Sequence, residues 1–355
     1  MIKSIKAEIQ SLGVKVSTYD GARKSGAGPA EGQLLFLDGV PANVPVSSSY
    51  VANSPYFIKK IGQDSLLFKN KNEIMTVKIP PKPNFYRYVT EDGIEYSKIA
   101  LKHGRDCLAT TVFQKCIYWD SNERCKFCGI ELSLRNGRTI EQKTPQQLSE
   151  VARVAEELDN IKHVVLTTGT VHSSENAVKY ISNCTRSIKS TVNLPVHVQI
   201  EPPSNTDALF ELKEAGVDTI GIHIESFDFS VLSYIAPVKA ALGMKRYEKA
   251  WEKSVEIFGI NQVSSFLIIG LGESRESIIE GAEYLAKKGV YPFLVPIRPI
   301  PGSLLQDSLP PPAELMIELY QEVGELLTQN DISSKKSKAG CVRCGACSAL
   351  PEFEK

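Results

Sequence analysis

The sequence lacks any run of about eighteen apolar residues, the length that a membrane-spanning helix needs. Its first residues, MIKSIKAEIQSLGVKV, are amphipathic and have no long apolar core. We therefore expect neither a signal peptide nor a membrane anchor, and a cytoplasmic protein. A net charge is also lacking, since Lys plus Arg and Asp plus Glu both number 41. We expect no nucleic-acid or membrane partner, but a small molecule or another protein.

A disulfide-like spread of cysteines is missing too, because the eight cysteines are clustered, which favours metal ligation in a reducing compartment. Cys116, Cys125 and Cys128 are spaced C-x8-C-x2-C, and Phe127 precedes the last of them. Three thiolates on one loop leave one iron of a [4Fe–4S] cluster open for chemistry. Zinc, with Cys107 as fourth ligand, is the alternative, but structural zinc loops usually pair two short knuckles, and only one lies here.

Residues 1–104 are predicted to form a small N-terminal α+β domain that ends in a linker. A helix is expected over 2–12, and a proline-stiffened segment, IPPKPNFYRY, over 79–88. The segment RKSGAGPAEG could bind an anion, but it lacks the lysine and the strand–helix context of a phosphate loop, so a glycine-rich turn is favoured. The expected strands are 34–38, 56–61, 66–69 and 73–77.

Residues 105–310 alternate apolar strands with amphipathic helices, which predicts an α/β fold. Six β/α units can be counted, short of the eight that close a full barrel, so we expect a partial (β/α)6 TIM-like barrel. Residues 311–355 are expected to add a helix over 313–329 and a cysteine-rich tail. The expected barrel strands are 108–114, 163–170, 196–200, 219–226, 262–273 and 292–300.

In parallel barrels the loops after the strands build the active site. The three-cysteine loop follows the first strand. Charged or polar residues at the ends of later strands are candidates for holding a cofactor or substrate, although His223 could equally be a buried histidine and Arg298 a surface ion pair. These candidates are Gln199, Glu201, His223, Glu225 and Arg298.

The cysteine loop resembles that of the radical S-adenosylmethionine (SAM) superfamily, in which C-x3-C-x2-C has an aromatic residue before the last cysteine. The first spacing departs from that pattern, with eight residues in place of three. Two further segments, in the same βα order, resemble the glycine-rich motif after strand two and the adenine-side motif after strand five. They are Thr167-Thr168-Gly169-Thr170 and Gly270-Leu271-Gly272-Glu273-Ser274. The resemblance covers roughly residues 107–306.

This resemblance implies a [4Fe–4S] cluster on Cys116, Cys125 and Cys128 whose open iron chelates SAM. It implies that one electron releases a 5′-deoxyadenosyl radical, which abstracts hydrogen from an unactivated carbon. The backbone of Thr168, Gly169 and Thr170 would hold the methionine amino group, and Glu201 the ribose hydroxyls. On the adenine side the implied residues are Gly270, Gly272 and Glu273.

The tail contains a second cysteine motif, Cys341-x2-Cys344-x2-Cys347. Three thiolates within seven residues are most easily explained by a second [4Fe–4S] cluster, with Cys107 as the expected fourth ligand. A zinc knuckle completed by Cys107 or Cys184 is the alternative. Ser348 is a further candidate ligand, and Cys184 is expected to be a buried apolar residue of a helix.

The segment RPIPGSLLQD resembles the sixth-strand exit of biotin-synthase-related members, and the whole pattern resembles archaeal two-component lipoyl synthases and nitrilase-cluster radical SAM proteins. The leading hypothesis is insertion of sulfur from the second cluster into C–H bonds of a protein-bound octanoyl chain. Expected partners are an octanoylated carrier protein, a second radical SAM protein and an electron donor such as ferredoxin. The alternatives are a tailoring step on a small amine or nitrile-related metabolite, with the second cluster as an electron relay, and a catalytically silent metal-binding scaffold.

Overall fold

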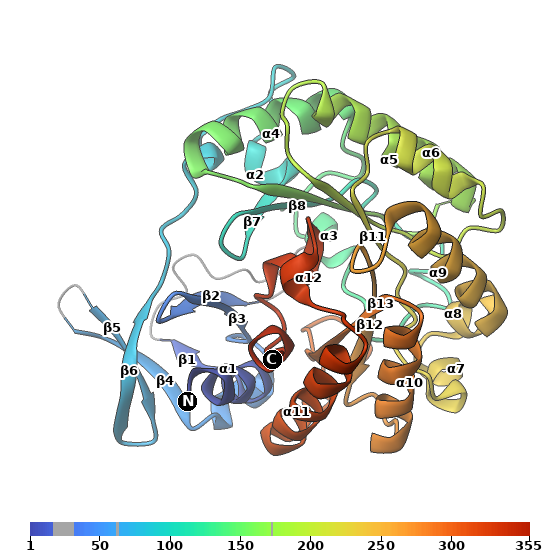
Figure 1. The fold of residues 1–355 in the computed structure, drawn as a ribbon. Helices are drawn as coiled ribbons and strands as arrows, with labels where there is room; N and C mark the ends of the chain where they lie inside the picture. Colours follow the sequence, from blue (N-terminus) through green and yellow to red (C-terminus); the bar gives the residue numbers. More distant parts are fainter. Residues whose placement is uncertain (17–31, 62–63, 172) are drawn as a thin grey trace.

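The computed structural model describes residues 1–16, 32–61, 64–171 and 173–355. It contains two sheets, a small one near the N-terminus and a larger curled one (Figure 1). The expected glycine-rich turn over residues 23–32 lies outside the described residues, apart from Gly32. No helix in the described ranges is long and apolar enough to cross a membrane.

The N-terminal sheet has six strands in the order β1-β4-β5-β6-β2-β3, and helix α1 (Ile2–Leu12) packs against β3. The helix has the bounds that its apolar spacing predicts. Two strands were not predicted from the sequence, β1 and β3, and β3 contains Pro41. This sheet and α1 enclose an apolar core of their own. The strands are β1 (Lys15–Val16), β2 (Gln33–Leu37), β3 (Val40–Val44), β4 (Tyr56–Ile61), β5 (Asp64–Lys69) and β6 (Asn72–Lys78).

The larger sheet has the order β13-β12-β11-β10-β9-β8-β7, in which β8 to β13 are parallel and β7 is an antiparallel edge strand. Six parallel strands that follow one another in sequence confirm the predicted partial (β/α)6 barrel. The strands are β7 (Leu101–His103), β8 (Cys107–Thr111), β9 (His163–Thr167), β10 (Val196–Gln199), β11 (Thr219–Gly221), β12 (Val263–Ile269) and β13 (Val290–Pro296).

Helices cover the outer face of this sheet (Figure 1). The first begins at a capping box, in which Thr144 and Gln147 bond each other's backbone N–H groups. The barrel helices are α4 (Pro145–Asp159), α5 (Ser174–Lys189), α6 (Ala208–Glu214), α7 (Phe229–Ile235), α8 (Pro237–Leu242), α9 (Met244–Phe258) and α10 (Arg275–Lys287). The short helical turns are η1 (Ser49–Asn53), η2 (Asn84–Arg87), α2 (Tyr96–Ile99), α3 (Leu132–Arg135), η3 (Ser334–Lys336) and η4 (Leu350–Glu352).

The C-terminal segment returns to the barrel. After α11 (Ala313–Gln329), the short helix α12 (Gly340–Cys344) packs against β9, β10 and β11 from inside the curl of the sheet (Figure 1). The backbone N–H of Gly340 donates to His163 Nδ1 at 3.2 Å, at the first residue of β9. The tail therefore enters the barrel from the end at which the strands begin, opposite the end that carries the three-cysteine loop.

Candidate functional site

The three-cysteine loop leaves β8 and is tied to the end of the next strand. The N–H of Ile117 donates to the Thr170 carbonyl at 3.0 Å, and the N–H of Cys116 donates to Glu131 Oε1 at 3.1 Å. At the other end of the loop, Arg124 lies over the Trp119 ring, 3.3 Å from its centroid. These contacts hold the loop over the carboxyl ends of the first two barrel strands, where parallel barrels place their active sites.

The three thiols of this loop lie within electrostatic reach of one another. Burial raises the pKa of Cys125 to about 12, and the Cys128 and Cys116 sulfurs contribute to the rise. Burial also raises the pKa of Cys128 to about 11, with Cys116 again adding to it. Thiolates are therefore disfavoured here unless a cation joins them, which is what iron bound to the sulfurs would supply.

Gly169 lies directly beneath the backbone of this loop. Its N–H donates to the Phe113 carbonyl at 2.9 Å, and a Cβ built on it would lie 1.9 Å from the carbonyl oxygen of Lys115. No side chain fits at this position. Beside it, the Thr170 hydroxyl donates to Glu201 Oε1 at 2.6 Å, and the Thr168 hydroxyl donates to the Gly169 carbonyl at 2.8 Å. The structure thus brings Thr168, Gly169, Thr170 and Glu201 together beside Cys116.

The turn after β12 is closed by its own glutamate. Both carboxylate oxygens of Glu273 accept backbone N–H groups, from Gly270 at 2.8 Å and from Leu271 at 3.0 Å. Gly270 and Gly272 have φ angles of 99° and 115°, which favour glycine. The predicted adenine-side residues therefore form one compact turn, in which the carboxylate of Glu273 shapes the backbone.

A buried ion pair stands at the end of β11. Lys239 Nζ donates to Glu225 Oε1 at 2.6 Å and to the His223 carbonyl at 2.7 Å. Burial lowers the pKa of Lys239, but the Glu225 carboxylate, followed by Tyr247 and Cys125, raises it, and the net shift is upward. Glu225 has a φ of 76°, which is strained for a side chain of this size. The sequence pointed to Glu225 but not to Lys239, which lies on a helix fourteen residues later.

Several buried polar atoms around this pair have no hydrogen-bond partner among the described residues. They are Glu225 Oε2, His223 Nε2 and the Tyr247 hydroxyl. The His223 ring stacks on Phe266 with centroids 3.9 Å apart, and its Nδ1 accepts the Phe266 N–H at 3.2 Å, so Nε2 carries the proton. Burial raises the pKa of Tyr247, and the charges of Glu225 and Cys125 add to the rise, so these groups lie near the cysteine loop. They can bind the polar groups of a ligand there.

The tail cysteines form a second centre at the opposite end of the barrel. Cys341 and Cys344 belong to α12, Cys347 follows it, and Cys107 begins β8. Cys107 packs with Cys344, Ala346 and Val165. Burial raises the pKa of Cys107, and the Cys344 and Cys341 sulfurs add to the rise. The structure therefore brings together the four cysteines that the sequence assigned to a second cluster.

The two other candidate ligands of the tail are engaged elsewhere. The Ser348 hydroxyl donates to the Leu294 carbonyl at 2.6 Å. Cys184 is fully buried on α5 among the apolar side chains of the barrel core, as expected from the sequence. Arg298 is likewise buried and donates to the Asn43 carbonyl on β3, which places its guanidinium against the N-terminal sheet.

Side chains of the N-terminal segment hold the tail in place. Lys6 on α1 is fully buried, and its Nζ donates to the Gly345 carbonyl at 2.8 Å and to both oxygens of Glu352 at 2.9 Å. Gln10, one turn further along α1, donates to the Ala346 carbonyl at 2.9 Å. Patterns of charge and apolarity in α1 did not reveal this role, because the partners lie more than 300 residues away.

One strand connects the two centres. Gln199 ends β10, and its Nε2 donates to Cys341 Sγ at 3.4 Å. Glu201 lies two residues further on and contacts Thr170, beside the three-cysteine loop. Two residues of extended chain span about 7 Å. The two centres thus face the same short stretch of barrel interior.

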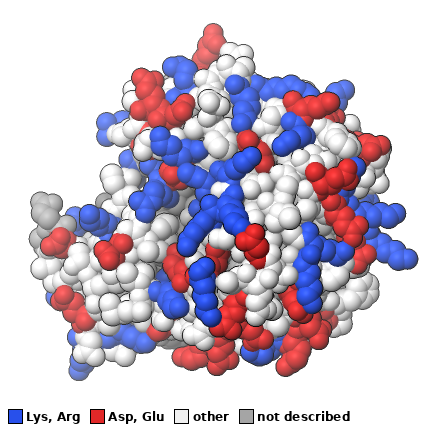
Figure 2. Space-filling model, in the orientation of Figure 1, with Lys and Arg blue, Asp and Glu red and all other residues white. Residues whose placement is uncertain are grey.

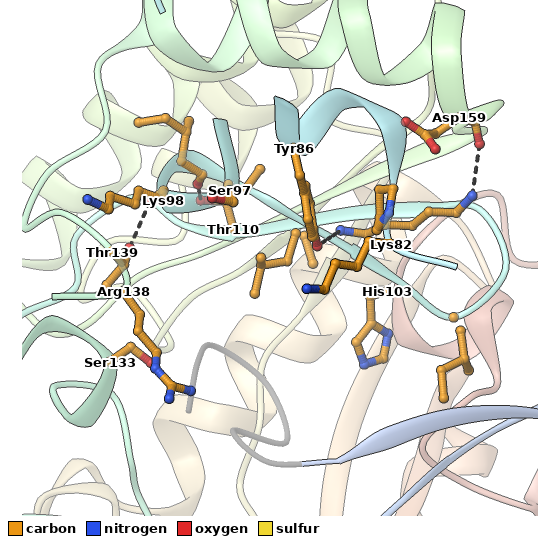
Figure 3. A pocket seen from close by; sticks show the side chains of 18 of the residues that line it. Lys82, Tyr86, Ser97, Lys98, His103, Thr110, Ser133, Arg138, Thr139 and Asp159 are labelled. Carbon is orange, nitrogen blue, oxygen red and sulfur yellow. Dashed lines mark hydrogen bonds between the residues drawn. The ribbon is translucent and has the colours of Figure 1, made fainter. Parts of the chain in front are cut away.

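A cavity of about 750 Å³ lies along the open edge of the barrel, between β7 and β8 and the N-terminal sheet (Figure 3). Ala109, Thr111 and Gln114 line its inner part, and His103 lies beside the tail centre. Figure 2 shows Lys and Arg side chains gathered toward the middle of this face of the molecule. The charged lining residues are Lys82, Arg87, Lys98, Lys102, Arg105, Arg138 and Lys143, with Glu95 and Asp159.

Lys143 lies at the inner wall of this cavity. Its Nζ donates to Gln114 Oε1 at 3.0 Å and to the Ile140 carbonyl at 2.9 Å, and Gln114 in turn donates to the Ile130 carbonyl at 2.7 Å. Burial lowers the pKa of Lys143 to about 7. Through Gln114, this lysine helps to hold the backbone at Ile130, just after the three-cysteine loop.

Fold and site together define a class of protein: a partial parallel barrel with three cysteines on the loop after its first parallel strand. A family model described as the radical SAM superfamily matches residues 121–285, which include Cys125 and Cys128. Residues 121–285 of this chain therefore form a radical SAM domain.

Three comparisons illustrate the range of similar proteins. Bacteriochlorophyllide c C-7(1)-hydroxylase of Chlorobaculum limnaeum is 22% identical over 345 residues, which cover 91% of this chain and 83% of that protein. An uncharacterized protein of Methanocaldococcus jannaschii is 25% identical over 166 residues, or 46% of this chain and 42% of that protein. The crystal structure of methylornithine synthase matches with a TM-score of 0.48 at 14% identity, covering 65% of this chain and 64% of that chain.

A radical SAM domain implies a [4Fe–4S] cluster and SAM, and the residues present fit both. The loop offers three soft thiolate donors, which suit iron–sulfur ligation. Gly169 has no room for a side chain beneath the loop. The partnerless polar atoms of His223, Glu225 and Tyr247 near Cys125 provide bonding capacity for a polar ligand.

Proposed function

We propose that this radical SAM enzyme inserts sulfur, drawn from a second iron–sulfur cluster on the tail, into unactivated C–H bonds of an octanoyl chain carried on a protein lysine. One observation carries the proposal: Gln199, the last residue of β10, donates to Cys341 of the tail, and Glu201, two residues further on, accepts from Thr170, whose carbonyl holds the three-cysteine loop at Ile117. A carbon atom placed there lies between the two centres. The substrate carbon must occupy such a position if the first centre activates its C–H bond and the tail centre supplies the sulfur atom.

The chain's own residues have distinct tasks in this reaction. Cys116, Cys125 and Cys128 hold the first cluster, while Thr168, Gly169, Thr170 and Glu201 orient SAM beside it. When bound, SAM supplies a 5′-deoxyadenosyl radical after receiving one electron. The substrate C–H bond loses a hydrogen atom to that radical. Cys341, Cys344 and Cys347 would hold the second cluster, which would supply the sulfide for the new C–S bond and whose iron would take up the remaining electron.

The cavity along β7 and β8 supports a substrate that enters from the side. Its lining includes Ala109 and Thr111 on β8 and His103, whose Nδ1 lies 3.5 Å from Cys344 Sγ. A rim rich in Lys and Arg favours an acidic carrier protein. We further propose a second radical SAM protein for the other sulfur and a ferredoxin-type electron donor. We place the enzyme in the cytoplasm, where the eight free thiols would stay reduced.

A second candidate is a radical tailoring step on a small amine or nitrile-related metabolite, with the tail cluster as an electron relay. The similarity to a C–H hydroxylase over 91% of this chain favours C–H functionalisation without sulfur transfer. In both candidates the first centre acts in the same way, and they differ in whether the tail cluster is consumed.

The deciding experiment is anaerobic turnover of the reconstituted protein with SAM, a reductant and an octanoylated carrier domain. Sulfur insertion predicts 5′-deoxyadenosine together with a thiolated carrier, at no more than one round of insertion per tail cluster. Formation of 5′-deoxyadenosine by protein with a loaded tail cluster, without any thiolated carrier, would contradict it. The control is Cys344→Ala, which should cleave SAM but yield no thiolated product.

A further inference from the structure

The turn between β7 and β8 places a histidine against the tail cysteines. In the antiparallel pair, His103 lies directly opposite Cys107. Directly opposed residues of a hairpin project from the same face, so both side chains point toward the tail. Gly104, at the turn, has a φ of 56°, and a Cβ built on it would lie 2.4 Å from Cys344 Sγ. The turn is therefore pressed closely against the tail centre.

His103 makes two polar contacts with tail thiols. Its Nδ1 lies 3.5 Å from Cys344 Sγ and its Nε2 lies 3.4 Å from Cys347 Sγ, so the ring stands between two tail thiols. Cys107 lies within electrostatic reach of Cys341 and Cys344 and packs with Cys344, Val165 and Ala346 in an apolar cluster. The imidazole thus makes a polar contact with a tail thiol through each of its nitrogens, whereas Cys107 meets the tail within an apolar cluster.

The charges around the tail favour a neutral fourth ligand. The tail centre is buried, and two cations stand beside it, Lys6 and Arg343. Lys6 is paired with Glu352 at 2.9 Å, and Arg343 with Asp106 at 3.1 Å. Their charges are therefore already balanced by carboxylates. Each further thiolate adds a negative charge to a buried site, whereas a neutral imidazole adds none, so histidine ligation lowers the cost of burying the centre.

We propose that His103 is the fourth protein ligand of the tail centre, which then has three cysteines and one histidine, with Cys107 packed beside it. The inference rests on the proposed function only in that the tail binds a metal centre. It replaces the fourth ligand expected from the sequence. Histidine in place of cysteine raises the reduction potential of iron–sulfur centres.

The test uses the full chain with Cys116, Cys125 and Cys128 changed to Ala, so that only the tail centre can be loaded. Iron, sulfide and zinc are first measured per chain. Pulsed electron paramagnetic resonance of the reduced protein, with and without ¹⁵N-labelled histidine, then detects nitrogen bound to iron. We expect a strongly coupled nitrogen that persists in Cys107→Ser and disappears in His103→Cys. His103→Cys should retain about four irons and show a lower potential.

A fully loaded tail centre without a coupled nitrogen, or one that loses its iron in Cys107→Ser but not in His103→Ala, would overturn the inference. If the tail holds zinc instead of iron, sulfur donation is ruled out while the ligand assignment is still tested. In that case X-ray absorption should show three sulfurs and one nitrogen, and four sulfurs would refute His103. A tail that binds no metal would refute both proposals.

Discussion

The two cysteine centres of this protein are built in opposite ways. The first comes from one loop, Cys116 to Cys128, that follows a single strand, and its backbone N–H groups are held by the Thr170 carbonyl and the Glu131 carboxylate. The tail centre combines α12, the β7–β8 hairpin and helix α1, which are far apart in the chain. A site made from one segment can be recognised from its spacing. A site made from several segments depends on how the whole molecule packs.

The largest expected effect separates the two centres by function. Cys125→Ala removes a ligand of the cluster that binds SAM. We expect reductive SAM cleavage to fall by more than about a hundredfold, because losing even a residue that only hydrogen-bonds to a metal ligand can reduce activity by about that factor. Cys344→Ala should leave SAM cleavage within a few-fold of the parent. Assays of 5′-deoxyadenosine formation check both variants. Equal losses of SAM cleavage in the two variants would show that the first centre requires the tail, and would contradict separate roles for the two centres.

Lys6→Met tests whether α1 is part of the tail centre. The change removes a buried cation and leaves Glu352 without its partner, which should destabilise the protein by about 3 kcal/mol. Iron should be lost from the tail but not from the loop. Chemical denaturation and iron counts provide the measurement. The control is Lys3→Met on the same helix, where the ammonium lies over the Phe353 ring and is exposed; a similar loss there would count against a specific role of Lys6.

Gly169→Ala probes the packing of the first loop. The added methyl group meets the Lys115 carbonyl oxygen at 1.9 Å, so the loop must shift, at a cost of about 1–3 kcal/mol. SAM cleavage should fall while the iron content of the tail is unchanged. Gly93→Ala is the matched control, because a Cβ there meets nothing within 4 Å and only its φ of 85° is strained. Unchanged SAM cleavage in Gly169→Ala would show that the loop does not need this close approach.

The smallest expected effect is a pH dependence at the first loop. Burial lowers the pKa of Lys143 to about 7, below its value in the unfolded chain. Between these two pKa values the unfolded state binds more protons, so the contribution of Lys143 to stability rises with pH, by about 1 kcal/mol per pH unit. Lys143→Met should remove this rise between pH 7.5 and 9, as followed by urea unfolding. Parallel stability curves for parent and variant would contradict the shifted pKa.

The barrel could be predicted from sequence because six apolar strands alternate with amphipathic helices, and each pattern is local. The end of β11 could not be predicted in the same way. Residues 219–226 look like one strand, but β11 ends at Gly221 and Glu225 takes a positive φ to reach Lys239. Strand β3 could not be predicted because Pro41 weakens the strand pattern of residues 40–44. Its antiparallel pairing with β2, which the sequence does not show, makes it a strand.

Sequence alone was sufficient for the three-cysteine loop, the order of the βα units and the grouping of Cys341, Cys344 and Cys347, because each depends on residues close together in the chain. Only the tertiary structure showed that the tail enters the barrel from the end where its strands begin, that Lys6 supports it, and that His103 stands among its thiols. Those contacts join residues 177 to 346 positions apart. No spacing rule reaches that far, since packing of the N-terminal helix and the barrel edge around the tail determines which side chains meet there.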